Sequence, residues 1–96
     1  MFSPGDDYIP FLEQAGCEPE VVAHCLAVRD VAIRIATSIS RTGTGVDLDL
    51  VAAGSVLHDI GRSITHGMGH ADAGGTICRN LGLDDRICHI VERHIG

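Results

Sequence analysis

Apolar residues recur every three or four positions along most of this chain, which is the spacing of an amphipathic α-helix and not the alternation of a β-strand. The pattern is longest after Pro19, which suits the first turn of a helix, and it continues to about Ser40. Its apolar stripe consists of Val21, His24, Val28, Val31 and Ile35, widened by Cys25, Ala32 and Ile39. We expect this stripe to face the core.

Capping residues and glycines divide the rest of the chain into four shorter helices. The expected helices cover residues 8–15, 48–60, 70–80 and 85–94. Asp47 and Asp84 stand where side-chain N-caps are needed, and the expected helix stops are Gly16, Gly61 and Gly82. No segment predicts a strand. The sequence therefore predicts an all-α, single-domain bundle of about five helices over residues 1–96.

Composition limits what such a bundle can do. The 96 residues make one domain, and because aromatic residues are only 3% of them, the core must consist of Val, Ile, Leu and Ala. The net charge is −6, and the seven basic residues are all arginines scattered along the chain. Binding a nucleic-acid backbone needs clustered positive charge, so we expect no nucleic-acid partner. A small phosphorylated substrate is compatible with this charge, because one arginine beside a metal ion can hold it.

The cysteines and the apolar segments bear on the cell compartment. The cysteines stand at positions 17, 25, 78 and 88, with no Cys-x-x-Cys pair and no spacing typical of a disulfide framework. We interpret them as reduced core residues of a cytoplasmic protein. The longest apolar stretches, about eight residues, are too short to cross a bilayer, and no basic leader precedes them. A homo-oligomer is compatible with the small core, although no interface is evident.

The candidate chemistry concentrates in residues 57–62, which contain the adjacent pair His58 and Asp59. An imidazole nitrogen beside a carboxylate oxygen suits a divalent transition metal, and His24 could add a third ligand from another helix. Three protein ligands would leave positions open for water and substrate. Each residue alone is weak evidence, because a lone histidine on an apolar face is more often a core residue bonded to a carbonyl.

Taken together, these residues resemble the HD-domain superfamily of metal-dependent phosphohydrolases. The resemblance rests on His24, on Leu57-His58-Asp59-Ile60-Gly61-Arg62, and on the later His66, His70 and His94. It covers nearly the whole chain and is strongest to small archaeal-type HD proteins, and the chain is also similar to HD nucleotidases that cleave symmetrical dinucleoside tetraphosphates. It implies that His24, His58 and Asp59 hold one metal ion. It also implies that Asp59 bridges to a second ion held by His70 and His94.

Local roles compete with some of these assignments. His70 at a helix start could simply make a local hydrogen bond, and His94 is favourable at any helix C-terminus. Arg62 stands where members of the family carry a basic residue and could bind a substrate phosphate, or it could be a surface arginine. His66, in a glycine-rich loop, could contact the substrate as a general acid or have no role. His89 is expected to be solvated.

One ligand that the resemblance implies has no counterpart. The family's fourth ligand is an Asp on a later helix, before which this chain ends. The acidic residues after Asp59 are Asp72, Asp84, Asp85 and Glu92. Asp72 lies close to His70 in sequence and is the nearest candidate. The alternatives are a shortened chain, or a fourth position filled by water, a neighbouring subunit or the substrate.

The preferred interpretation is an enzyme that hydrolyses a phosphate ester or anhydride of a small molecule, first of all a nucleotide, at a site between the second, third and fourth helices. It would be a phosphomonoesterase, a phosphodiesterase or a nucleotide pyrophosphohydrolase. One or two ions of Mn, Fe, Ni, Co or Zn would lower the pKa of water and polarise the phosphoryl oxygen. The expected catalytic residues are His58, Asp59, which would also accept a proton, and Arg62.

Two other interpretations stay open. The first is a non-catalytic HD module that binds a metal ion or a nucleotide in a regulatory role. The second is a helical interaction domain in which the histidines occur by chance, which predicts no metal and no stabilisation by Mn or Ni.

Overall fold

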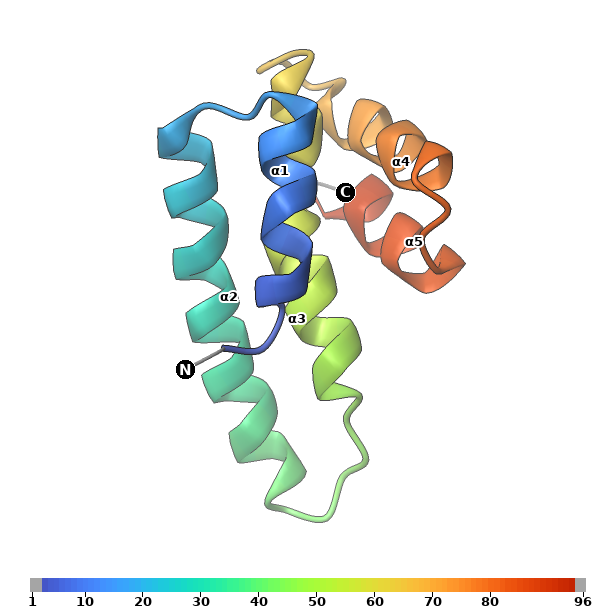
Figure 1. Cartoon of the computed structure of the whole chain (residues 1–96). Coiled ribbons are helices and arrows are strands. Elements are labelled where there is room, and N and C mark those ends of the chain that lie inside the picture. Colours follow the sequence, from blue (N-terminus) through green and yellow to red (C-terminus); the bar gives the residue numbers. More distant parts are fainter. Residues whose placement is uncertain (1–2, 95–96) are drawn as a thin grey trace.

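A computed structural model describes residues 3–94, and the regular elements in that range are all helical (Figure 1). Their bounds are η1 Asp6–Tyr8, α1 Ile9–Ala15, α2 Pro19–Ser40, α3 Leu48–Leu57, η2 Ile60–Ser63, α4 His70–Asn80 and α5 Asp85–Arg93, where η denotes a short 3-10 helix. The prediction of an all-α bundle of five helices is confirmed. None of the helices described between residues 3 and 94 has the length and apolar character that a membrane span needs.

The predicted caps form most of the helix boundaries. Oδ1 of Asp47 accepts a hydrogen bond from the backbone N–H of Leu50 at 3.0 Å, and Oδ1 of Asp84 accepts one from the N–H of Arg86 at 2.8 Å. Both aspartates therefore satisfy a backbone donor that the first turn of a helix leaves free. Gly16 ends α1 with a φ of 86°, a left-handed conformation that glycine adopts at little cost.

The predicted end of the third helix is wrong. Helix α3 ends at Leu57, so His58 and Asp59 lie in the turn that joins α3 to η2. Gly61 is not a helix stop but a point where two backbones meet. A Cβ on Gly61 would overlap the carbonyl oxygen of His70 and lie 2.6 Å from the backbone nitrogen of Gly74. This close approach brings the start of α4 against the turn that carries Asp59.

The helices enclose one small aliphatic core. Helices α2 and α3 run antiparallel, and α4 and α5 lie together on the other side of α3 (Figure 1). The fully buried side chains of the core are Leu12, Cys25, Val56, Leu57, Ile60, Cys78, Cys88 and Val91. Three of the four cysteines thus fill core space as predicted, and Cys17 is half-buried.

The prediction for the apolar stripe of α2 is wrong in part. Val21 and Cys25 are buried, but Val31, Ile35 and Ile39 are between 44% and 57% exposed. The helix instead turns Arg29 inward. Its Nη1 donates to the carbonyl oxygen of Pro4 and to Oδ1 of Asp6, each at 2.8 Å. The N-terminal segment therefore covers the Arg29 side of α2 and leaves the outer part of the stripe in solvent.

Candidate metal centre

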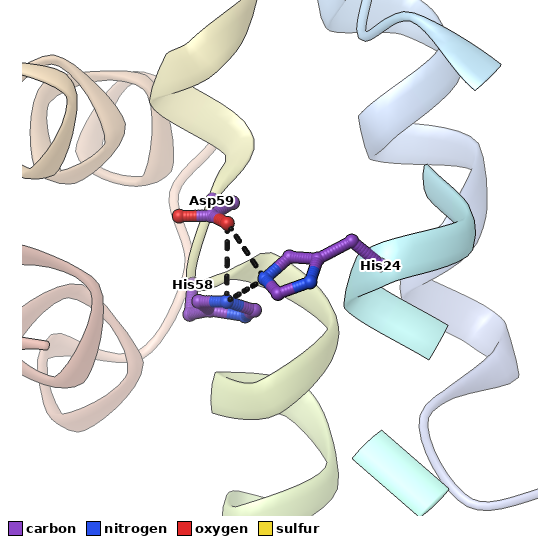
Figure 2. A group of neighbouring side chains, drawn as sticks. All are labelled: His24, His58 and Asp59. Atoms are coloured by element: carbon purple, nitrogen blue, oxygen red, sulfur yellow. Dashed lines mark hydrogen bonds and ion pairs between the residues drawn. The ribbon is translucent and has the colours of Figure 1, made fainter. Parts of the chain in front are cut away.

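The carboxylate of Asp59 is the centre of the site, and its side chain is only 3% exposed. One of its oxygens, Oδ2, lies 3.1 Å from Nε2 of His24 and 3.2 Å from Nε2 of His58. The two Nε2 atoms are 3.3 Å apart. Figure 2 shows His24 reaching from α2 toward His58 and Asp59, which follow the end of α3. These three residues therefore converge on one point.

The other carboxylate oxygen faces a second pair of histidines. Oδ1 of Asp59 lies 3.2 Å from Nε2 of His70 and 3.1 Å from Nε2 of His94. The two imidazole nitrogens are 3.0 Å apart. His70 is the first residue of α4 and His94 is the C-cap of α5. Asp59 thus joins two groups of three residues, each compact enough to surround one ion.

Backbone carbonyls fix the orientation of three of the four rings. Nδ1 of His58, His70 and His94 lies 2.6, 2.8 and 2.7 Å from the carbonyl oxygens of Ser55, Gly67 and Val91, respectively. Because a carbonyl only accepts hydrogen bonds, Nδ1 carries the hydrogen in each neutral ring. Nε2 of each ring, which lies within 3.2 Å of an Asp59 oxygen, then carries the lone pair, as it does in metal-ligating histidines.

This donor set fits a cation. In the neutral state, Nε2 of His58, His70 and His94 carries no hydrogen and yet lies within 3.2 Å of a carboxylate oxygen, so no hydrogen bond joins these partners. Two such groups repel each other unless a proton or a metal ion lies between them. Imidazole nitrogen together with carboxylate oxygen is the ligand combination of Mn, Fe, Co, Ni and Zn sites.

Burial and charge set the protonation of the central pair. Burial lowers the pKa of His58 below its ordinary value of 6.5, more strongly than the neighbouring carboxylate raises it. Burial alone would raise the pKa of Asp59, but His58, which is protonated at the acidic pH where the carboxylate titrates, and Arg62 outweigh it and hold the pKa below its ordinary value of 3.8. Near pH 7 the arrangement is therefore a neutral imidazole beside an ionised carboxylate, which is the state a metal ion requires.

Arg62 lies at the edge of the same site. Its Nε is 3.1 Å from Oδ2 of Asp59, although the N–H direction makes no well-formed hydrogen bond. Its side chain remains 34% exposed. Its two terminal nitrogens make no hydrogen bond or ion pair with any residue in the range 3–94, so their N–H groups are free for a ligand.

Three further polar residues, at positions 66, 72 and 89, lie outside the cluster. His66 is exposed, and its Nε2 is 4.0 Å from Oε1 of Glu18 instead of facing Asp59. Asp72 is exposed and belongs to neither group of candidate ligands. His89 is exposed, as expected, with its Nδ1 3.9 Å from Oε1 of Glu92. The structure therefore does not bring the predicted substrate contact His66 together with the other site residues.

The site involves one more helix than its predicted placement between the second, third and fourth helices. His94, which the resemblance names as a ligand, brings in α5 as well. The orienting carbonyls were missed too. Each of the three carbonyls belongs to the residue three positions before its histidine, so a histidine just after a helix end, as at His58 and His94, or just after a loop turn, as at His70, was the available signal.

Comparisons with known proteins show which family and which relatives this chain resembles in sequence. The family model for the HD domain matches residues 21–96. An uncharacterised protein of Methanocaldococcus jannaschii is 50% identical over 80 residues, which cover 83% of this chain and 47% of the relative. A tRNA (cytidine(56)-2'-O)-methyltransferase of Thermoplasma volcanium is 40% identical over 88 residues, covering 92% of this chain and 25% of that protein.

More distant relatives match over a similar share of the chain. A ribonuclease Y of Fervidobacterium nodosum is 32% identical over 78 residues, covering 79% of this chain and 14% of the relative. The chain thus spans less than half the length of each of these relatives. No solved structure matches significantly. From the match over residues 21–96 and the histidines gathered around Asp59, we conclude that the chain belongs to the HD domain family.

Proposed function

We propose that the protein is a metal-dependent phosphohydrolase that cleaves a phosphate ester or anhydride of a small molecule, with nucleotides as the first class to test. The observation that carries this proposal is the position of Asp59, whose two oxygens each face two imidazole nitrogens. Membership of the HD domain family supports metal-dependent hydrolysis in general. The small-molecule substrate is our inference from the acidic charge and scattered arginines.

The proposed ligands divide into two sets that share one carboxylate. His24, His58 and Asp59 would hold one ion, and Asp59, His70 and His94 would hold another. When bound, such ions lower the pKa of water and polarise a phosphoryl oxygen. Because each set contains nitrogen and oxygen donors, we propose Mn, Fe, Ni, Co or Zn as the metal.

Two residues of the chain would act directly on the attacking water and the substrate. Asp59 stays ionised near pH 7, since its pKa lies below the ordinary value, and it can accept a hydrogen bond from an attacking water. The free N–H groups of Arg62 would bind a phosphate oxygen and stabilise negative charge as the bond to the leaving group breaks. His66, 56% exposed and facing Glu18, takes no part in the proposed reaction.

The test is phosphate release from p-nitrophenyl phosphate, bis-p-nitrophenyl phosphate and a panel of nucleotides, with Mn²⁺ or Ni²⁺ supplied. We expect Asp59→Asn to lower turnover by at least about 100-fold, since it weakens both proposed ligand sets at once. The exposed His89→Gln is the matched control and should keep wild-type activity. Equal turnover by Asp59→Asn and the wild type would contradict the proposal.

RNA is the main competing substrate, because the names of the ribonuclease Y and tRNA methyltransferase relatives concern RNA. A net charge of −6 does not favour a polyanion, so we propose that no nucleic acid is bound. A single-stranded oligoribonucleotide belongs in the same assay. Cleavage of it at a rate above that of the nucleotides would replace the small-molecule substrate with RNA.

A non-catalytic module is the second candidate function. The observation that favours it is that a homologous segment makes up 25% of a relative named as a methyltransferase, which is not a hydrolase name. Such a module would bind Mn²⁺ or a nucleotide without turning it over. Calorimetry with Mn²⁺ and nucleotide, followed by analysis of the recovered nucleotide, separates the two functions: intact nucleotide supports the module, and hydrolysed nucleotide supports the enzyme.

A further inference from the structure

A groove of about 540 Å³ opens beside the candidate metal centre. Three of the residues that line it, His24, His58 and His94, are also neighbours of Asp59. Its volume lies within the range of roughly 300–1,000 Å³ that is typical of small-molecule sites. A molecule held at the histidines would therefore extend into this groove.

The remainder of the groove is apolar. Val28 from α2, Val51 from α3 and Ile90 from α5 line it, and among residues 3–94 no Asp, Glu or Arg does. The one hydroxyl, of Ser55, already donates to the carbonyl oxygen of Val51 at 2.7 Å. An apolar group that covers this surface is bound favourably, because apolar area leaves water. A charged group finds no partner on it.

A glycine shapes the floor of the groove. A Cβ at Gly54 would lie only 2.8 Å from Cγ2 of Ile90. The missing side chain therefore lets Ile90 lie directly against α3, while 36% of Ile90 stays exposed. The apolar floor of the groove therefore depends on the absence of a side chain at Gly54.

We propose that this groove binds the organic part of the substrate, so that the protein selects phosphate compounds with an aromatic or otherwise apolar group next to the phosphate. The inference rests on the proposed function and adds the substrate class. Val28, Val51 and Ile90 are then the residues that determine specificity. A sugar phosphate or inorganic pyrophosphate would leave this apolar surface uncovered and would bind more weakly.

The experiment compares phenylphosphonate with methylphosphonate, which share one head group, differ in the apolar group and are not hydrolysed as esters. Binding to the Mn²⁺-loaded protein is measured by calorimetry. We expect phenylphosphonate to bind about tenfold more tightly, because a buried ring removes apolar area from water. Equal affinity would overturn the inference and leave the proposed function intact. Binding of neither compound would overturn both.

Two matched substitutions on α2 locate the effect. Val28 lines the groove, whereas Val31, one turn further along, does not. Val28→Ser should lower the preference for phenylphosphonate by about threefold, and Val31→Ser should leave it unchanged.

Sedimentation velocity tests whether a second copy of the chain occupies the groove instead of a substrate. If both substitutions dissociate a dimer of the wild-type protein and neither alters the preference, a second copy of the chain covers the groove and the inference is wrong.

Discussion

Nε2 of His94 lies 3.1 Å from Oδ1 of Asp59, although 35 residues separate them in the sequence. The position of His94 completes the site, because it places the end of α5 beside the turn after α3. The carbonyl of Val91 holds the ring of His94 so that the nitrogen facing Asp59 carries a lone pair. The second half of the candidate centre therefore depends on helix packing and not on a local motif.

Metal stoichiometry should follow this division into two sets. We expect two equivalents of metal in the wild type, about one in His94→Gln, and none in Asp59→Ala, since Asp59 belongs to both sets. The measurement is elemental analysis after incubation with Mn²⁺ and removal of free ions. His89→Gln should match the wild type. Full metal content in Asp59→Ala would rule out the assigned ligands.

Gly61→Ala should destabilise the protein through a backbone contact. The added methyl group would collide with the carbonyl oxygen of His70, which cannot move without shifting α4. We expect the free energy of unfolding in urea to fall by about 1–3 kcal/mol. Gly45→Ala is the control, because a Cβ there meets nothing within 4 Å. If both variants have the same stability, the tight contact at Gly61 does not exist in solution.

Features encoded by neighbouring residues were predictable from the sequence. The caps at Asp47 and Asp84 and the stop at Gly16 depend on residues within one turn, so the starts of α3 and α5 and the end of α1 agree with the prediction. The end of α3 does not, because it depends on the long-range contact between Gly61 and α4. The core-facing side of α2 was misplaced for a similar reason, since residues 4–6 bind Arg29.

The candidate site shows the same contrast. The pair His58 and Asp59 and the third ligand His24 were suggested by the residues themselves, and the candidate ligands His70 and His94 followed from the family resemblance. What the sequence could not indicate is which ring nitrogen faces the carboxylate, because backbone carbonyls set that. Nor could it show that His66 turns toward Glu18, since glycines at 67 and 69 leave the direction of that loop open.

Stability of the metal-free protein should decrease in mild acid. Burial holds the pKa of His58 below 6.5, whereas in the unfolded chain it takes up a proton at about pH 6.5. Between these two pKa values the unfolded chain binds more protons, so stability is complete above pH 6.5 and is lost as the pH falls through the folded pKa. Urea unfolding at pH 7.5 and 5.5 measures the loss.

Substitutions assign this loss to one residue. His58→Gln should show a smaller decrease between the two pH values than the wild type, because glutamine does not titrate. His89→Gln, at an exposed position, should show the full decrease. The same decrease in the wild type and both variants would mean that His58 does not carry the effect.

The thiols of Cys25 and Cys78 should resist alkylation while the protein is folded. Burial raises the pKa of each to about 12, so the reactive thiolate is scarce at pH 8. We expect iodoacetamide to modify these two at least about 100-fold more slowly than in urea, where thiols have a pKa near 8.5. Peptide mass spectrometry over time gives the rate for each cysteine. Cys25 follows His24 on α2. Rapid modification of Cys25 in the native protein would therefore mean that α2 separates from α3, and that the ligand set containing His24 is not held together.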